Sequence, residues 1–357
     1  MAFFKKLIRN IKNRDDDDDD DDTVTVRGVK KPKYYGTVVP YPDFNASSDA
    51  SVLEDAIKTK GVDEDVIISV LAKRSNDQRQ KIKVVYETSA GEKLGEALKS
   101  SLRSDLEDVS LALLMTPAMF DAHLLRKATK HWGTNEKVLV EVLATRTNEQ
   151  IEEIKRVFKE EYNVELEEVI KDETSGDFTK ALLAMLEAKR SVSTDVNMDL
   201  AVKDAEALFE AGENHSGTDV SAFIDILTTR SGPQLSKTFQ HYKIISDNSL
   251  PVALGLELKG DIEDCLVDTV KACWNTPAFF AERLHEAMKK SSLWSSLKGH
   301  GTCEETLIRI LVSRSEVDLK KILVQYRLMY DVSLQDDIVR DTEGHYRDIL
   351  LALCGPI

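Results

Sequence analysis

The stretch Gly133-Thr-Asn-Glu-Lys-Val-Leu-Val-Glu-Val-Leu-Ala-Thr-Arg-Thr147 decides the fold, because its pattern occurs four times in the chain. In each copy a glycine is followed thirteen residues later by an arginine and then by a serine or threonine. The four glycines are 72, 84 and 84 residues apart. The matching pairs are Gly61 with Arg74, Gly133 with Arg146, Gly217 with Arg230, and Gly301 with Arg314. Such a recurrence indicates a repeat protein with four units.

Each unit has the pattern of packed helices. Apolar residues recur at helical spacing between the glycine and the arginine, as in Val138, Leu139, Val142 and Leu143. After the arginine, the first three units have a capping box that ends on glutamine, and Ser315 with Asp318 is a weaker version. A similarity between Thr116–Ala128 and Thr276–Met288 suggests that the units also form two pairs. Strand-type alternation is nearly absent, so we expect an all-α fold.

Charge and composition limit the function. The 357 residues are 42% hydrophobic and carry a net charge of −15, to which Asp15–Asp22 contributes eight negative charges. Nucleic acid is therefore not an expected partner, and an anionic membrane would repel the chain unless cations intervene. We find no apolar run long enough to cross a membrane and no signal peptide. The four cysteines have no metal-ligand spacing and are interpreted as reduced thiols of a cytosolic protein.

Residues 1–47 differ in composition from the rest, and we expect them to form a mobile tail. Apolar residues from Phe3 to Ile11 lie opposite basic ones, as in a helix that rests on a membrane or enters a partner's groove. Disorder is the alternative for so short a segment. The run Asp15–Asp22 is interpreted as a solvated spacer, or as a clasp for the basic segment. The stretch Lys31–Pro42 is not expected to form regular structure.

Three of the repeated glycines are followed by an acidic residue at a fixed distance of forty. The pairs are Gly133 with Glu173, Gly217 with Glu257, and Gly301 with Asp341. Ca²⁺ takes six to eight oxygen ligands, and loop carbonyls with one carboxylate supply about five of them. The remaining positions would suit water or a lipid phosphate oxygen. Any single loop could be an ordinary helix–helix turn, but the repeated spacing favours calcium.

These loops resemble the Met-Lys-Gly-x-Gly-Thr…Asp/Glu motif of the annexin family, and the resemblance covers about residues 46–357. It implies four annexin-type five-helix repeats in a curved disc, with calcium loops on the convex, membrane-facing side and a flexible N-terminal tail. On this basis the chain divides into the tail, repeat 1, repeat 2, a linker with repeat 3, and repeat 4. The expected boundaries are 1–47, 48–118, 119–190, 191–278 and 279–357.

The resemblance also implies the calcium ligands. In repeats 2 to 4 these would be three loop carbonyls and one carboxylate each: Thr129, His131, Gly133 and Glu173; Gly212, His215, Gly217 and Glu257; Leu297, Gly299, Gly301 and Asp341. Additional ligands are expected in the first two repeats, namely Gly61, Val62, Glu64, Lys99, Leu102, Glu107, Thr134 and Glu136.

Three departures from the family pattern affect these sites. His131 replaces a motif glycine, which would strain its loop. Ser101 stands where the first repeat would need its distal carboxylate, so only a weaker local site is expected there. About nine additional residues, Lys289–Leu297, precede the fourth loop. In that insertion Trp294 either anchors in the headgroup zone or packs locally at a longer helix end, and both readings stay open.

The expected function is calcium-dependent binding of anionic phospholipid membranes. The resemblance adds membrane organisation, aggregation or trafficking and a phospholipase A2 inhibitor-like role. The tail would bind an EF-hand protein or a second membrane. The alternative is a solenoid scaffold that binds proteins through its tail and concave face. No P-loop, nucleophile elbow or zinc-protease motif is present, so we expect no enzyme. We expect a cytoplasmic protein that joins membranes when calcium rises; export without a signal peptide stays open.

Overall fold

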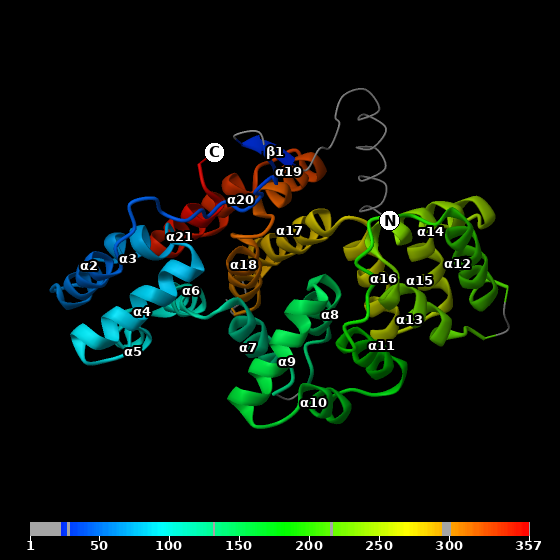
Figure 1. Ribbon diagram of the computed structural model, residues 1–357, viewed down its shortest axis with the longest axis horizontal. Coiled ribbons are helices and arrows are strands. Elements are labelled where there is room, and N and C mark those ends of the chain that lie inside the picture. Colours follow the sequence, from blue (N-terminus) through cyan, green and yellow to red (C-terminus); the bar gives the residue numbers. More distant parts are fainter. Residues whose placement is uncertain (1–22, 27–28, 131–132, 215–216, 295–300, 357) are drawn as a thin grey trace. The chain divides into compact units, whose positions relative to one another are not determined.

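The computed structural model describes residues 23–26, 29–130, 133–214, 217–294 and 301–356. In this part of the chain twenty helices follow the predicted repeats, five to each, and confirm the all-α prediction (Figure 1). The predicted amphipathic segment and the aspartate run lie outside the described residues.

Each repeat places its helices in the same order along the chain. Repeat 1 contains α2 (Ala46–Lys58), α3 (Glu64–Leu71), α4 (Asn76–Ala90), α5 (Leu94–Ser101) and α6 (Ser104–Leu114). Repeat 2 contains α7 (Pro117–Ala128), α8 (Glu136–Thr145), α9 (Asn148–Tyr162), α10 (Leu166–Glu173) and α11 (Gly176–Leu186). Repeat 3 contains α12 (Met198–Ala211), α13 (Val220–Thr229), α14 (Gly232–Ile245), α15 (Leu250–Glu257) and α16 (Asp261–Trp274). Repeat 4 contains α17 (Thr276–Trp294), α18 (Gly301–Arg314), α19 (Leu319–Tyr330), α20 (Leu334–Asp341) and α21 (Gly344–Cys354).

A short antiparallel pair of strands precedes the helices. β1 (Thr23–Val26) pairs with β2 (Val29–Pro32), and Val24 lies opposite Lys31. The prediction that regular structure is absent from Lys31 onward is therefore wrong for its first two residues. The β-branched residues of β1 favour a strand, and Pro32 is tolerated because it stands at the strand end.

The segment that follows β2 packs against repeat 4, so it is not the mobile tail that the sequence suggested. The backbone N–H groups of Thr37 and Val38 both donate to the carbonyl of Ser315, at 2.7 and 3.0 Å. The Thr37 hydroxyl donates to the carbonyl of Leu353 at 2.6 Å, and Lys320 N–H donates to the carbonyl of Tyr35 at 3.0 Å. The Val38 side chain is 4% exposed. These contacts fix residues 35–38 on the fourth repeat.

The helices form two compact units, and the two repeats whose sequence similarity suggested pairs, the second and the fourth, belong to different units. One unit combines repeats 1 and 4, and the other combines repeats 2 and 3. In the first unit α18 and α21 pack against α6, and α21 also packs against α3. In the second unit α8 and α11 pack against α16, and α11 also packs against α13. The repeats therefore pair first with fourth and second with third.

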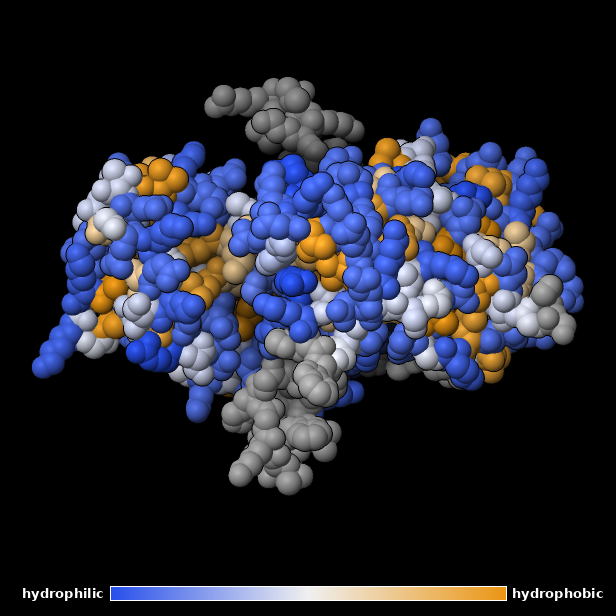
Figure 2. All heavy atoms as spheres, turned by 90° about the horizontal axis from the view of Figure 1, so that it is seen from below, coloured by the Kyte–Doolittle hydropathy of each residue, from blue (hydrophilic) through white to orange (hydrophobic). Residues whose placement is uncertain are grey.

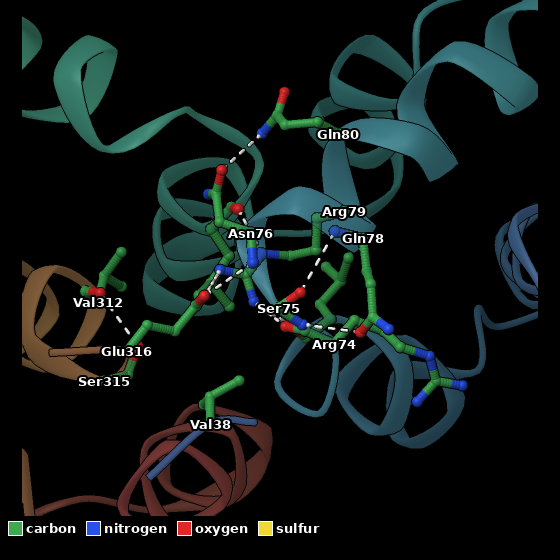
Figure 3. Close-up of polar contacts among 12 residues, drawn as sticks. Val38, Arg74, Ser75, Asn76, Gln78, Arg79, Gln80, Val312, Ser315 and Glu316 are labelled. Carbon is green, nitrogen blue, oxygen red and sulfur yellow. Dashed lines mark hydrogen bonds and ion pairs between the residues drawn. The ribbon is translucent and has the colours of Figure 1, made fainter. Parts of the chain in front are cut away.

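A buried ion pair joins repeats 1 and 4 inside the first unit (Figure 3). One oxygen of the Glu316 carboxylate accepts hydrogen bonds from Asn76 N at 2.7 Å and from Arg79 Nη2 at 3.0 Å. Arg79 is 2% exposed and also donates to the carbonyls of Leu113 and Leu71, at 2.7 and 3.0 Å. The N-terminal end of α4 is thus held by a residue from the fourth repeat.

The repeated arginine forms an ion pair inside each of the first three repeats, buried in repeat 2 and partly buried in repeats 1 and 3. Its guanidinium makes two hydrogen bonds, at 2.6 to 2.9 Å, with an aspartate from the first helix of the same repeat. The pairs are Arg74 with Asp49, Arg146 with Asp121, and Arg230 with Asp204. Two parallel hydrogen bonds give such a pair a defined geometry, so it fixes the second helix on the first.

The fourth repeat departs from this scheme. Its aligned position holds Ala281, and Arg314 pairs instead with Asp318 in the following turn, at 2.8 and 2.7 Å. Asp318 therefore makes no side-chain cap on α19, so the weak capping box predicted with Ser315 is wrong. Among the described helices, full capping boxes start α4 and α9 alone. In α14 the N-cap is Ser231, while the side chain of Gln234 bonds to the backbone of Asn197.

The surface is mainly polar. Hydrophilic colour predominates on the face drawn in Figure 2, and the hydrophobic colour is scattered over it. The exposed large apolar side chains are likewise spread along the chain, for example Val84, Val192 and Ile244. Among the described residues, no helix is both long and apolar enough to cross a membrane.

Candidate metal centres

The loop between α7 and α8 lies next to the end of α10 in the second repeat. Gly133 has φ +100°, a conformation that favours glycine, and it is exposed. The loop closes through a 2.9 Å hydrogen bond from Asn135 N to the carbonyl of Ala128. The Thr134 hydroxyl donates to the carbonyl of Glu173 at 3.0 Å. The loop and the acidic residue forty positions away are therefore brought together, as the spacing predicted.

The third repeat has the same arrangement. Gly217 has φ +88°, and Asp219 N donates to the carbonyl of Ala211 at 2.8 Å. The Thr218 hydroxyl lies 3.5 Å from the carbonyl oxygen of Glu257 and 3.4 Å from its carboxylate. The side chains of Glu173 and Glu257 are both exposed and are therefore free to meet a ligand from solvent. The expected ligands His131 and His215 lie outside the described residues.

Three further predicted ligands lie beside these loops. Thr129 is 2% exposed, and its hydroxyl donates to the carbonyl of Leu125 at 3.0 Å. Only its backbone carbonyl was predicted as a ligand, and this contact does not occupy it. Glu136 is the first residue of α8 and is half-buried. Gly212 is the C-cap of α12, with φ −110° and ψ −99°.

The first repeat has a similar loop without the distal acid. Gly61 has φ +92°, and Asp63 N donates to the carbonyl of Ala56 at 3.0 Å. Val62 has φ +45°, which is unusual for a β-branched residue. Glu64 begins α3 and is half-buried. The end of α5, where the other repeats have their acid, is Ser101.

The other predicted ligands of the first repeat surround the turn between α5 and α6. Lys99 is exposed in the last turn of α5, and Leu102 is its buried C-cap. Glu107 lies in the first turn of α6 and is half-buried. Ser104 at the start of α6 has φ +57°. Any site here would depend on a turn held in a conformation that favours glycine.

The fourth repeat shows only part of its predicted site. Leu297 and Gly299 lie outside the described residues, and Gly301 begins α18. The Asp341 carboxylate accepts two hydrogen bonds from Arg340, both at 2.9 Å. α17 has 19 residues, against 12 to 14 in α2, α7 and α12. The insertion thus lengthens this helix as far as Trp294. The Trp294 side chain is not among the described parts of the chain.

The chemistry of the described loops fits Ca²⁺. Among the described residues, no group of three or more His, Cys, Asp or Glu side chains is arranged to hold a metal. Each candidate centre offers one carboxylate beside a loop of backbone carbonyls, which suits a hard cation with many oxygen ligands. The positions that a Cβ would take at Gly133 and Gly217 have no heavy atom within 4 Å. The loops therefore leave open space at these glycines.

One residue that organises the third loop was missed by the sequence analysis. Glu213 follows Gly212, and its carboxylate accepts hydrogen bonds from Tyr242 at 3.1 Å, from Asn248 at 2.8 Å and from Ser246. Burial alone would raise the pKa of Glu213, but these hydrogen bonds outweigh it and leave the pKa lowered. The ionised carboxylate ties the loop to the end of α14. No repeat of this residue exists in the other units that could have revealed it.

Comparison with known proteins gives a family match along the four repeats. The sequence model of the Annexin family matches residues 48–113, 120–185, 203–268 and 279–353. Annexin A1 of Rattus norvegicus is 52% identical over 318 residues, which are 89% of this chain and 89% of that protein. Annexin A1 of Homo sapiens has the same identity and the same coverage of both chains.

Solved structures show the same similarity. Annexin III matches with a TM-score of 0.85 and 44% identity over 90% of this chain and 98% of its own. Chicken annexin V in complex with Zn²⁺ has a TM-score of 0.83 and 42% identity, covering 91% and 100% of the two chains. Calcium-bound annexin (Sm)1 has a TM-score of 0.79 and 30% identity, covering 92% and 94%.

Proposed function

The chain belongs to the annexin family of calcium-dependent phospholipid-binding proteins, and we propose that it binds anionic membranes through Ca²⁺ held in its inter-helix loops. The observation that carries this proposal is the contact between loop and acid in repeats 2 and 3. In both, a threonine hydroxyl next to the positive-φ glycine reaches the acidic residue at the end of the fourth helix. A binding role needs no catalytic group, and we propose none.

Two kinds of residue would form each calcium site, namely ligands of the ion and threonines that position the loop. Loop carbonyls and the exposed carboxylates of Glu173 and Glu257 would hold the ion, which supplies the positive charge that a chain of net charge −15 lacks. Thr134 and Thr218 would keep each loop against its acid. A site with one carboxylate binds Ca²⁺ weakly, so an anionic lipid oxygen would raise the affinity by completing the ligand shell.

Calcium-dependent sedimentation with phosphatidylserine vesicles tests this proposal. Binding should require calcium and reverse on chelation. The double variant Glu173→Gln, Glu257→Gln should need more than about tenfold more calcium, which corresponds to about 1.4 kcal/mol. Glu168→Gln is the matched control, because Glu168 is an exposed acid of α10 outside the loop. Equal sedimentation in calcium and in chelator would reject the proposal.

We also propose more specific roles that depend on membrane binding. Coverage of lipid would organise or aggregate membranes and would inhibit a phospholipase by hiding its substrate. The basic segment in residues 1–13 would bind a second membrane or an EF-hand protein. Deleting it should leave binding to one vesicle intact and reduce vesicle clustering. These roles would suit a cytoplasmic protein that moves to membranes when the calcium concentration rises.

A further inference from the structure

A hollow of about 500 Å³ opens in the first repeat between α4, α5 and α6. Three lysines line it, namely Lys83 from α4, Lys93 at the N-cap of α5, and Lys99 from α5. Lys83 is half-buried, and its ammonium group donates to the carbonyl of Leu114 at 2.8 Å and to Gln80 at 3.1 Å. It has no ion pair among the described residues. A partly desolvated cation therefore faces the hollow without a paired carboxylate, although the exposed Glu87 lies at the rim.

The second repeat has a lysine at the same position, and there it faces carboxylates. Lys155 occupies the equivalent position, 72 residues on, and it donates to the equivalent carbonyl, that of Leu186, at 3.1 Å. There the ammonium also pairs with two carboxylates, Glu152 at 3.1 Å and Glu167 at 3.2 Å. In the first repeat Gln80 replaces the first of these acids, and Gly95 replaces the second. The hollow therefore holds the place that Glu167 fills in repeat 2.

The backbone conformation of Gly95 does not require glycine. It lies inside α5, and its φ is not positive. Glycine within a helix costs about 0.5–1 kcal/mol relative to alanine. An added Cβ would meet only a methyl group of Leu111 at 3.9 Å, which is an ordinary contact. The missing side chain leaves space above Lys83 at some cost in helix stability.

The walls of the hollow are apolar apart from its charges. They include Leu94, Leu111, Leu114 and Met115, and the last is half-buried. Glu87 and Glu96 also line the rim and are exposed, so the three lysines leave a net positive charge. A ligand that matched both the positive charge and the apolar walls would have an anionic group that pairs with Lys83 and an apolar part that contacts the leucines.

We propose that this hollow binds a carboxylate on an apolar stem, of the fatty-acid class, with its head in the place of the missing Glu167 side chain. A carboxylate is favoured over other anions because a carboxylate occupies the equivalent place in repeat 2. Lys83 would be its primary partner, and Lys93 would be the nearer of the exposed lysines along the chain to Gly95. The inference does not involve the calcium loops of repeats 2 and 3, although Lys99 is also among the ligands predicted for the first repeat.

Calorimetric titration of the full chain with decanoate tests this, in chelator and without vesicles. We expect saturable binding of one decanoate. Lys83→Met, which keeps the stem and removes the charge, should weaken it at least about tenfold, or 1.4 kcal/mol. Gly95→Glu should weaken it as much, because it supplies the internal carboxylate that repeat 2 has. Lys155→Met and Gly95→Ala are the controls and should leave the affinity within about twofold.

Several results would overturn the proposal. Decanoate could fail to bind, or Lys155→Met could weaken binding as much as Lys83→Met does. Decanol could bind as tightly as decanoate, which would make the hollow merely apolar. A hexa-aspartate peptide could displace decanoate at lower concentration, which would make the occupant an acidic peptide. Thermal unfolding of each variant separates these outcomes from loss of the fold. Because calcium is chelated, failure here would leave the membrane proposal intact.

Discussion

Ser104 occupies a backbone conformation that the other three repeats give to glycine. Its φ is +57°, and the equivalent residues Gly176, Gly260 and Gly344 have φ of +65°, +75° and +62°. A residue with a Cβ is disfavoured in this region by roughly 1–2 kcal/mol. Glycine avoids this strain, but it loses more backbone entropy on folding, so the net gain in stability is smaller. Ser104→Gly should therefore raise the free energy of unfolding by about 0.5–1 kcal/mol, measured by urea denaturation. The control Gly176→Ala should lower it, and a loss of stability in Ser104→Gly would contradict the strain argument.

Asp341 differs from the other distal acids because a cation already holds it. Arg340 grips its carboxylate with two hydrogen bonds, and the equivalent residues of repeats 2 and 3 are Asp172 and Leu256. Calcium would have to displace the guanidinium, so we expect the proposed fourth site to be weaker than its motif suggests. Arg340→Lys keeps the charge but removes the two-pronged contact. It should lower the calcium needed for half-maximal vesicle binding by up to about fivefold, or 1 kcal/mol. An unchanged or higher requirement would show that Arg340 does not compete.

At the level of helices, the buried arginine pairs should dominate the response to mutation. The Arg146 side chain is 3% exposed and that of Asp121 is 7% exposed. Asp121→Asn leaves a buried cation without its anion, which should cost about 3–5 kcal/mol of unfolding free energy. Replacing both partners, Arg146→Met with Asp121→Leu, should cost much less. The exposed Asp225→Asn serves as the control and should change stability by less than about 0.5 kcal/mol. Equal losses in the single and double variants would contradict this account.

Most helices could be predicted because their apolar spacing and capping residues act locally. The exceptions depend on distant contacts. Asp318 resembles a capping residue, but it pairs with Arg314 because the first helix of repeat 4 has Ala281 in place of an aspartate. Residues 35–38 look irregular in sequence, and they are ordered by hydrogen bonds to Ser315 and Leu353, far along the chain. Local patterns carry no information about such partners.

The candidate site could be predicted in part for the same reason. The forty-residue spacing recurs, so it related the loops of Gly133 and Gly217 to Glu173 and Glu257, and the structure adds the contacts of Thr134 and Thr218. Arg340 and Glu213 each occur in one repeat, so comparison between repeats could not reveal their roles. Gly95 also differs from its charged counterpart in repeat 2, but the hollow beside it is seen only in the structure.

On the scale of the whole molecule, the segment between β2 and α2 joins the last repeat to the first. Residues 35–38 bond to repeat 4, and three residues later the backbone of Tyr41 makes two 2.9 Å hydrogen bonds with the side chain of Gln78 in repeat 1. The guanidinium of Arg74 also lies 3.9 Å from the centre of the Tyr41 ring. Together with Glu316, this segment links two repeats that are distant in sequence. The unit of repeats 1 and 4 should therefore depend on residues 34–41.

Two truncations that differ by nine residues isolate that dependence. A chain that begins at Lys33 keeps these contacts, whereas a chain that begins at Pro42 loses the burial of Val38 and the six hydrogen bonds to repeats 1 and 4 described above. Burial of one valine and a few net hydrogen bonds together contribute roughly 3 kcal/mol. Hydrogen exchange should therefore accelerate in α4, α19 and α21 only for the shorter chain. Exchange in α13 should stay unchanged, because repeat 3 belongs to the other unit. Calcium-dependent vesicle binding through Glu173 and Glu257 should survive both truncations. If the two chains exchange alike, residues 34–41 lie on the fourth repeat without supporting it, and Glu316 with the apolar contacts of α18 and α21 holds the unit together alone.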